Sequence, residues 1–126
     1  MDSPSHTVLV VDDDPSIRFL CRVNLELDGW AVREAGTLDE ARGELLEGDV
    51  GVVLLDVHVG TQSGIDYLDE LRRDHPDVSV AMLTGSVGTP TLEGTRPDGV
   101  LAKPFTLEQL AETVRRLAPR TAHSAG

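Results

Sequence analysis

The stretch Thr7-Val8-Leu9-Val10-Val11-Asp12-Asp13-Asp14-Pro15 joins a continuous apolar run to three acidic residues and a proline. Uninterrupted runs rich in β-branched residues are typical of strands that are buried on both faces, as in parallel sheets. Asp14 suits the N-cap of a helix and Pro15 suits its first turn. The stretch therefore predicts a buried strand that is followed at once by a helix.

Three further apolar runs end in the same manner, each closing on residues that carry polar chemistry. These runs and the residues that close them are 50–55 with Asp56, 78–83 with Thr84-Gly85, and 99–102 with Lys103-Pro104. In an open parallel sheet, functional groups gather at the carboxyl ends of the strands. We therefore expect the closing residues of the four runs to meet in one crevice.

The rest of the chain alternates between strand and helix patterns. Residues 30–35 alternate apolar and polar side chains, which favours a strand at or near a sheet edge. Helical patterns follow the first, second, third and fifth strands, and capping-box sequences at Thr37 and Thr106 open two of them. Residues 57–63 are expected to form a loop. Such alternation with short connections requires right-handed crossovers, and so predicts an α/β fold whose parallel sheet has helices on both faces.

Composition narrows the class of protein. The chain of 126 residues is long enough for one domain with one core, and we expect that domain to span residues 1–119, with 120–126 as a disordered tail or linker. A net charge of −11 argues against direct binding to nucleic acid or to an anionic membrane. No apolar stretch reaches the roughly 18 residues of a membrane span, and the start of the chain does not resemble a signal peptide. A single cysteine, Cys21, fits a reducing cytoplasm, which is the expected location.

Asp12, Asp13 and Asp56 would place three like charges in a small space. Uncompensated, such carboxylates raise one another's pKa and destabilise the fold. A divalent cation removes that problem, and all-oxygen ligation is what Mg²⁺ prefers. With Mg²⁺ bound, one carboxylate can act as a nucleophile toward a phosphoryl donor and form an acyl phosphate.

Three neighbouring residues suit the phosphoryl group itself. The hydroxyl of Thr84 can donate a hydrogen bond to one phosphoryl oxygen, and the ammonium of Lys103 can offset the charge of another. Gly85 leaves room for a backbone amide to approach. These residue types, at the ends of successive strands, predict a site for phosphoryl transfer that works by positioning and charge neutralisation.

The sequence resembles the receiver domains of two-component response regulators, over about residues 7–117. The motifs that carry the resemblance are Val-Val-Asp-Asp-Asp-Pro at 10–15, Leu-Leu-Asp at 54–56, Gly64, Met-Leu-Thr-Gly at 82–85 and Lys-Pro-Phe at 103–105. The resemblance implies a flavodoxin-like, doubly wound sheet of five parallel strands in the order 2-1-3-4-5. It also implies a cis peptide bond between Lys103 and Pro104, which proline makes accessible.

The resemblance further implies the role of each site residue. Asp56 would be the phosphoacceptor, which takes a phosphoryl group from a histidine kinase or a phosphotransfer protein. Asp12, Asp13 and Asp56, with the backbone carbonyl of His58, would hold Mg²⁺, and Thr84, Gly85 and Lys103 would hold the phosphoryl group. The chain would then be a monomeric signalling domain that promotes its own phosphorylation and dephosphorylation and is not a turnover enzyme. Its downstream partner would be a separate protein or a fused output domain.

Three stretches depart from the usual pattern of that family. The loop after the phosphoacceptor reads Val59-Gly60 where Met-Pro is usual, so we expect it to be more mobile. Val100 stands where an aromatic switch residue is usual. Residues 85–99 are rich in glycine and proline, which predicts that the fourth helix of the family is short or absent.

Two other functions fit parts of the sequence. A phosphatase of the haloacid dehalogenase type would use Asp12 as nucleophile, but it needs acidic metal ligands on a strand beyond Lys103 and leaves Asp56 without a role. A pseudo-receiver would bind partners without being phosphorylated. A single-domain regulator and a receiver that is part of a longer protein both remain compatible with the sequence.

Overall fold

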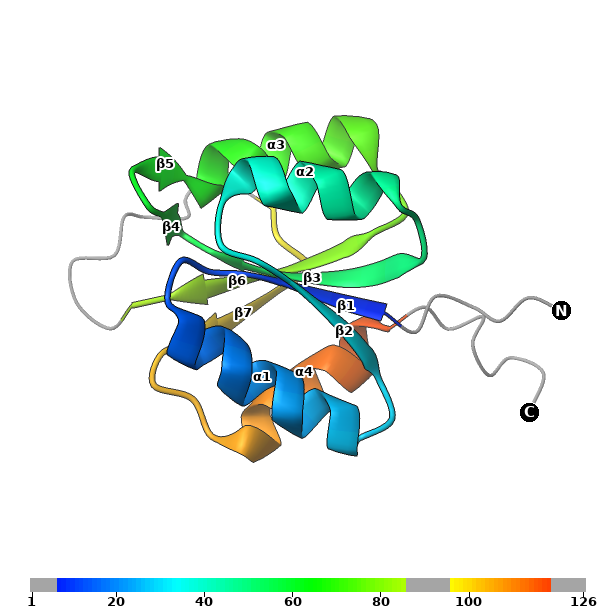
Figure 1. The fold of residues 1–126 in the computed structure, drawn as a ribbon, viewed down its shortest axis with the longest axis vertical. Helices are drawn as coiled ribbons and strands as arrows, with labels where there is room; N and C mark the ends of the chain where they lie inside the picture. The colour runs from blue at the N-terminus through cyan, green and yellow to red at the C-terminus, as the bar shows by residue number, and fades with distance from the viewer. Residues whose placement is uncertain (1–6, 86–95, 119–126) are drawn as a thin grey trace, which may run out of the picture.

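A computed structural model describes residues 7–85 and 96–118. Their main feature is a five-stranded sheet in the order β2-β1-β3-β6-β7, in which all neighbouring strands are parallel (Figure 1). The strands are β1 (Thr7–Val11), β2 (Ala31–Ala35), β3 (Val50–Asp56), β6 (Ser79–Thr84) and β7 (Gly99–Ala102). Counted within the sheet alone, this is the predicted order 2-1-3-4-5, and β2 is the predicted edge strand.

Helices cover both faces of the sheet, as the alternating pattern predicts. They are α1 (Pro15–Leu27), α2 (Leu38–Leu46), α3 (Gly64–Asp74) and α4 (Leu107–Leu117). Figure 1 shows α1 and α4 together on one face and α2 and α3 together on the other. The carboxyl ends of the strands are therefore left uncovered by the helix layers.

The core is divided by the sheet into two apolar clusters. Successive side chains of a strand point to opposite faces, so Val8 and Val10 of β1 join the cluster under α1 and α4. Leu9 and Val11 join the cluster under α2 and α3. All four are fully buried, which explains why this strand reads as an uninterrupted apolar run.

Side-chain caps fix where the helices begin. Asp14 is the N-cap of α1 and accepts a hydrogen bond from the backbone of Ser16 at 2.9 Å. The capping box predicted at Thr106 is complete. The box predicted at Thr37 is only half formed, because the carboxylate of Glu40 accepts its 2.7 Å hydrogen bond from Gly36 N–H instead of from Thr37. Both side chains still satisfy backbone donors near the start of α2.

Residues 57–63, expected to be a loop, contain a small hairpin. Strands β4 (His58–Val59) and β5 (Gln62–Ser63) pair in antiparallel fashion. Gly60 has a φ of 65° at the first position of the two-residue turn, where glycine is favoured in type II′ hairpins. The side chain of Val59 is 2% exposed and packs in the core under α2 and α3. Two-residue strands are too short to show a period in the sequence, which is why the pattern did not predict them.

Two expectations concern parts of the chain outside the described residues. The short or absent fourth helix falls mainly on residues 86–95, and the disordered tail falls on residues 120–126. Within residues 7–85 and 96–118, no helix is both long and apolar enough to cross a bilayer.

Candidate functional site

Asp12 is the most deeply buried carboxylate of the candidate site. It follows β1 directly and is fully buried, with its backbone N–H donating to Ala35 O of β2 at 3.1 Å. Its Oδ1 accepts a hydrogen bond from Asp14 N–H at 2.9 Å, and its Oδ2 accepts one from Lys103 Nζ at 2.7 Å. Both carboxylate oxygens are therefore held in place, which is what a buried charge requires.

Asp13 and Asp56 complete an acidic cluster with Asp12. One carboxylate oxygen from each of the three residues lies within 4.8 Å of the other two. Asp13 is exposed, whereas the side chain of Asp56, at the end of β3, is 14% exposed. The structure thus brings Asp56 next to the consecutive pair Asp12 and Asp13, which is distant from it in the sequence, as the strand-end argument predicts.

The surroundings of Asp56 raise its pKa from the ordinary value of 3.8 to about 6. Burial is the largest cause, and the charge of Asp12 acts in the same direction. The charge of Lys103 and a hydrogen bond from the backbone of His58 oppose the rise. The ionised carboxylate is therefore disfavoured at this position, and an added positive charge would stabilise it.

Lys103 supplies a positive charge to the cluster. Its Nζ lies 2.7 Å from Asp12 Oδ2 and 3.5 Å from Asp56 Oδ2. Burial alone would lower the pKa of this ammonium, but the hydrogen bond to Asp12 and the nearby negative charges outweigh it and raise the pKa. The peptide bond between Lys103 and Pro104 is cis, as the resemblance implies. One ammonium among three carboxylates leaves the cluster net negative.

Thr84 and Gly85 reach the site through strand register. Asp56 pairs with Leu83, which precedes Thr84, and Thr84 pairs with Ala102, which precedes Lys103. Thr84 is 8% exposed, and its backbone carbonyl accepts a hydrogen bond from Lys103 N–H at 2.7 Å. Gly85 follows at the surface. Thr84 therefore lies at the carboxyl ends of the strands, as the carboxylates and the lysine do.

Gly64, which carries part of the sequence resemblance, has a steric role behind Asp56. A Cβ built on Gly64 would overlap the backbone carbonyl oxygen of Asp56. The Gly64 N–H donates to Val57 O at 2.6 Å, so α3 begins directly against the end of β3. His58, which lies between Asp56 and Gly64 in the sequence, is exposed, and its backbone N–H donates a hydrogen bond to the carboxylate of Asp56.

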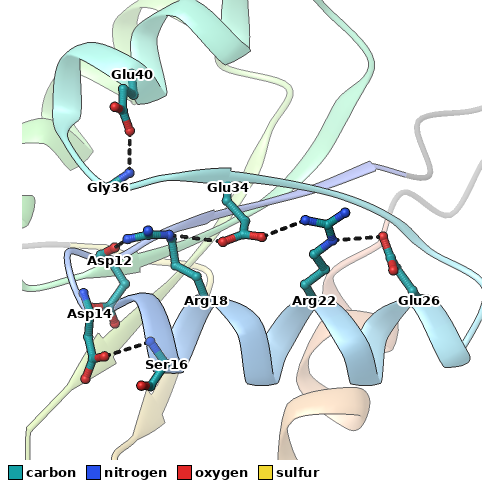
Figure 2. A network of polar contacts seen from close by, with 9 residues as sticks. All are labelled: Asp12, Asp14, Ser16, Arg18, Arg22, Glu26, Glu34, Gly36 and Glu40. Atoms are coloured by element: carbon teal, nitrogen blue, oxygen red, sulfur yellow. Dashed lines mark hydrogen bonds and ion pairs between the residues drawn. The ribbon is translucent and has the colours of Figure 1, made fainter.

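Arg18 is a site neighbour that the sequence pattern did not reveal. Figure 2 shows its guanidinium between Asp12 and Glu34, where it donates to the backbone carbonyl of Asp12 at 2.6 Å and to Glu34 Oε1 at 3.1 Å. The sequence feature that could have pointed to Arg18 is its position one helical turn after the N-cap Asp14. Its partner Glu34 lies on the edge strand β2, and only the folded chain brings the two together.

The donor set fits a divalent cation. It consists of carboxylate oxygens alone, one of them on a fully buried residue, and no described cysteine belongs to it. Hard oxygen ligands of this kind suit Mg²⁺ and Ca²⁺ better than softer transition metals. The raised pKa of Asp56 and the net negative charge give the cluster a physical reason to bind such an ion.

The sequence of the chain matches a family model and several known proteins. The family model described as "Response regulator receiver domain" matches residues 8–115. The chain is 32% identical to "Probable transcriptional regulatory protein TcrX" of Mycobacterium tuberculosis, with 95% of this chain and 53% of TcrX aligned. It is 36% identical to "Sensor kinase CckA" of Brucella abortus, with 91% of this chain and 13% of CckA aligned.

A solved structure is similar to this chain in fold as well as in sequence. The beryllofluoride-activated NtrC4 receiver domain dimer superposes with a TM-score of 0.80 at 32% identity, covering 90% of this chain and 96% of that one. The chain thus spans about half of TcrX and a small part of CckA, but almost the whole of the NtrC4 domain.

Proposed function

Because the chain belongs to the receiver-domain family of response regulators, which are signalling domains, we propose that Asp56 is its phosphoacceptor. The observation that carries this assignment is the difference between Asp56 and Asp12. Both oxygens of Asp12 are engaged, by Asp14 N–H and by Lys103 Nζ, and the residue is fully buried. The side chain of Asp56, which lies like Asp12 at the carboxyl ends of the strands, keeps 14% of its surface exposed. A phosphoryl donor can approach Asp56 but not Asp12, which argues against the phosphatase alternative.

The proposed reaction is transfer from a phosphohistidine to the carboxylate. An oxygen of Asp56 attacks phosphorus, and the new O–P bond forms as the P–N bond breaks. The electron pair of the broken bond remains on the imidazole nitrogen, which takes up a proton from solvent. Lys103 and the hydroxyl of Thr84 stabilise the charge on the phosphoryl oxygens, and Gly85 lets the backbone approach them.

Asp12, Asp13, Asp56 and the backbone carbonyl of His58 would hold Mg²⁺. The bound ion supplies positive charge that offsets both the carboxylates and the phosphoryl oxygens. The raised pKa of Asp56 supports this part of the proposal, because the carboxylate must be ionised to act as a nucleophile near neutral pH.

The wider setting follows from the same proposal. The donor is a histidine kinase or a phosphotransfer protein, and the phosphorylated domain binds a downstream protein or acts on a fused output domain. The relatives named as a transcriptional regulator and as a sensor kinase extend well beyond the region that matches this chain, which supports the arrangement with a fused output domain. We propose a cytoplasmic, monomeric domain, spanning residues 1–119, that is not a turnover enzyme and contacts neither nucleic acid nor membrane.

Intact-protein mass spectrometry tests the proposal. Wild-type protein incubated with acetyl phosphate should gain the mass of one phosphoryl group in the presence of Mg²⁺ and none in a chelator. Asp56→Asn should gain none in either condition. Asp69→Asn, which changes an exposed aspartate of α3, should behave like wild type. Equal labelling of Asp56→Asn and wild type would refute the assignment, and no labelling of wild type would favour a pseudo-receiver.

A further inference from the structure

Arg18 makes a contact that links the edge of the sheet to the acidic cluster. Its guanidinium donates to the backbone carbonyl of Asp12 at 2.6 Å and to Glu34 Oε1 at 3.1 Å. The second oxygen of Glu34 accepts from Arg22 at 3.0 Å, and Arg22 also contacts Glu26 at 3.3 Å (Figure 2). Of the two arginines in this network, Arg18 is the one that contacts the main chain of a site residue.

The surroundings of Arg18 are built to hold it in one position. Its side chain is 20% exposed, compared with 51% for Arg22. A Cβ on Gly36 would lie 2.9 Å from a guanidinium nitrogen of Arg18, so the glycine leaves the space that this group occupies. Gly36 is itself held by its hydrogen bond to Glu40. A partly buried guanidinium with two partners in fixed directions is a rigid support rather than a solvated surface charge.

The contact controls the direction of a peptide group. The peptide bond between Asp12 and Asp13 is planar, so fixing its carbonyl oxygen also fixes the N–H and Cα of Asp13. Asp13 is the exposed member of the cluster, and Asp12 is anchored by its side chain. We propose that Arg18 is a positioning residue that orients the Asp12–Asp13 peptide and thereby places the Asp13 carboxylate for cation binding. This inference rests on the proposed function only in taking the cluster to bind Mg²⁺.

Charge and position predict opposite effects when Arg18 is removed. Arg18→Met deletes a positive charge close to a cation site, and by Coulomb's law this alone would tighten Mg²⁺ binding. Loss of orientation would weaken binding instead. Outer partners that orient metal ligands typically contribute 10- to 100-fold in affinity, so we expect Arg18→Met to weaken Mg²⁺ binding about tenfold. The sign of the change therefore separates the two roles.

The experiment compares Mg²⁺ dissociation constants, measured by isothermal titration calorimetry, for wild type, Arg18→Met, Arg18→Lys and Arg22→Met. Arg22→Met is the matched control, since it removes the same charge and a contact with the same Glu34 without touching Asp12. The Mg²⁺ affinity of Arg22→Met should stay within about twofold of that of wild type, because Arg22 is exposed and its charge is screened by solvent. Arg18→Lys keeps the charge but lacks the two-pronged donor, so it should still bind Mg²⁺ more weakly than wild type.

Amide exchange of Asp14 gives a second readout that does not depend on Mg²⁺. Its N–H donates to Asp12 Oδ1 and should exchange faster in Arg18→Met than in Arg22→Met, both measured in a chelator. Mg²⁺ binding by Arg18→Met that is unchanged or tighter, or weakened no more than in Arg22→Met, would overturn the inference. If Arg18→Met does not fold, Arg18→Lys decides by the same criteria. Wild-type protein that fails to bind Mg²⁺ would instead count against the proposed function.

Discussion

Asp12, Asp13 and Asp56 carry the same chemical group in three different surroundings. Asp12 is fully buried with both oxygens hydrogen-bonded, Asp13 is exposed, and Asp56 lies between these extremes. Burial and the charge of Asp12 raise the pKa of Asp56 to about 6. Environment, and not residue type, distinguishes the proposed nucleophile from its neighbours.

The raised pKa predicts how the free energy of unfolding depends on pH. Because the folded-state pKa of about 6 exceeds the ordinary 3.8, Asp56 contributes stability in its protonated form that is lost as the pH rises through about 6. Asp56→Asn cannot ionise and should not lose it. In a chelator, the variant should be more stable than wild type above pH 6, by up to about 3 kcal/mol for a pKa difference of about two units.

Urea unfolding of both proteins across the pH range measures this difference. It should shrink as the pH falls from about 6 and vanish near pH 4. If the difference in stability between Asp56→Asn and wild type does not change with pH, ionisation of Asp56 is not what destabilises the wild-type protein.

At the scale of elements, α3 begins directly against the end of β3, and glycine makes the approach possible. Gly64→Ala would place a methyl group on the backbone carbonyl oxygen of Asp56, and the overlap cannot be relieved by rotating a side chain, because the position of the Cβ is fixed by the backbone. The start of α3 must then move away from the site. We expect a loss of about 3 kcal/mol or more in the free energy of unfolding, as for other severe overpacking.

Gly43→Ala is the matched control for this substitution. Gly43 lies inside α2, and a Cβ there meets nothing within 4 Å. Replacing a helix-interior glycine by alanine should therefore stabilise the protein by about 0.5 to 1 kcal/mol. Chemical denaturation of the two variants should show changes of opposite sign, and a Gly64→Ala protein as stable as wild type would show that the close approach has been misjudged.

The sequence could predict those helices and strands that are long enough to show a pattern of apolar residues. The apolar runs ending at Asp12, Asp56, Thr84 and Lys103 predicted the strands of the site, and parallel pairing explains why their ends converge. The hairpin at residues 58–63 was missed because its two-residue strands carry no period. The contact of Arg18 with Asp12 and Glu34 was missed because it depends on how α1 packs against β2.

At the scale of the whole molecule, a net charge of −11 and an acidic cluster at one edge of the sheet make cations natural ligands. A cation that binds only the folded state stabilises it by mass action, by about 2.7 kcal/mol at one hundred times its dissociation constant. Mg²⁺ should therefore raise the melting temperature of wild type. Asp13→Ala should abolish that rise while leaving the fold intact, because it removes a ligand and relieves repulsion together.

Asp14→Ala provides the control for the melting experiment. It removes the N-cap of α1 and should lower the starting stability by about 1 kcal/mol. Its melting temperature should nevertheless rise with Mg²⁺ as that of wild type does, since Asp14 lies outside the cluster of three carboxylates. A wild-type melting temperature that is indifferent to Mg²⁺ would end this prediction.

Borohydride trapping can show directly whether Asp56 carries the phosphoryl group. Borohydride reduces an aspartyl phosphate to homoserine, which peptide mass spectrometry can locate in the sequence. After incubation with a phosphodonor and Mg²⁺, we expect homoserine at position 56 alone, and none when the Mg²⁺ is chelated. Homoserine at position 12 or 13, with position 56 unchanged, would contradict this expectation.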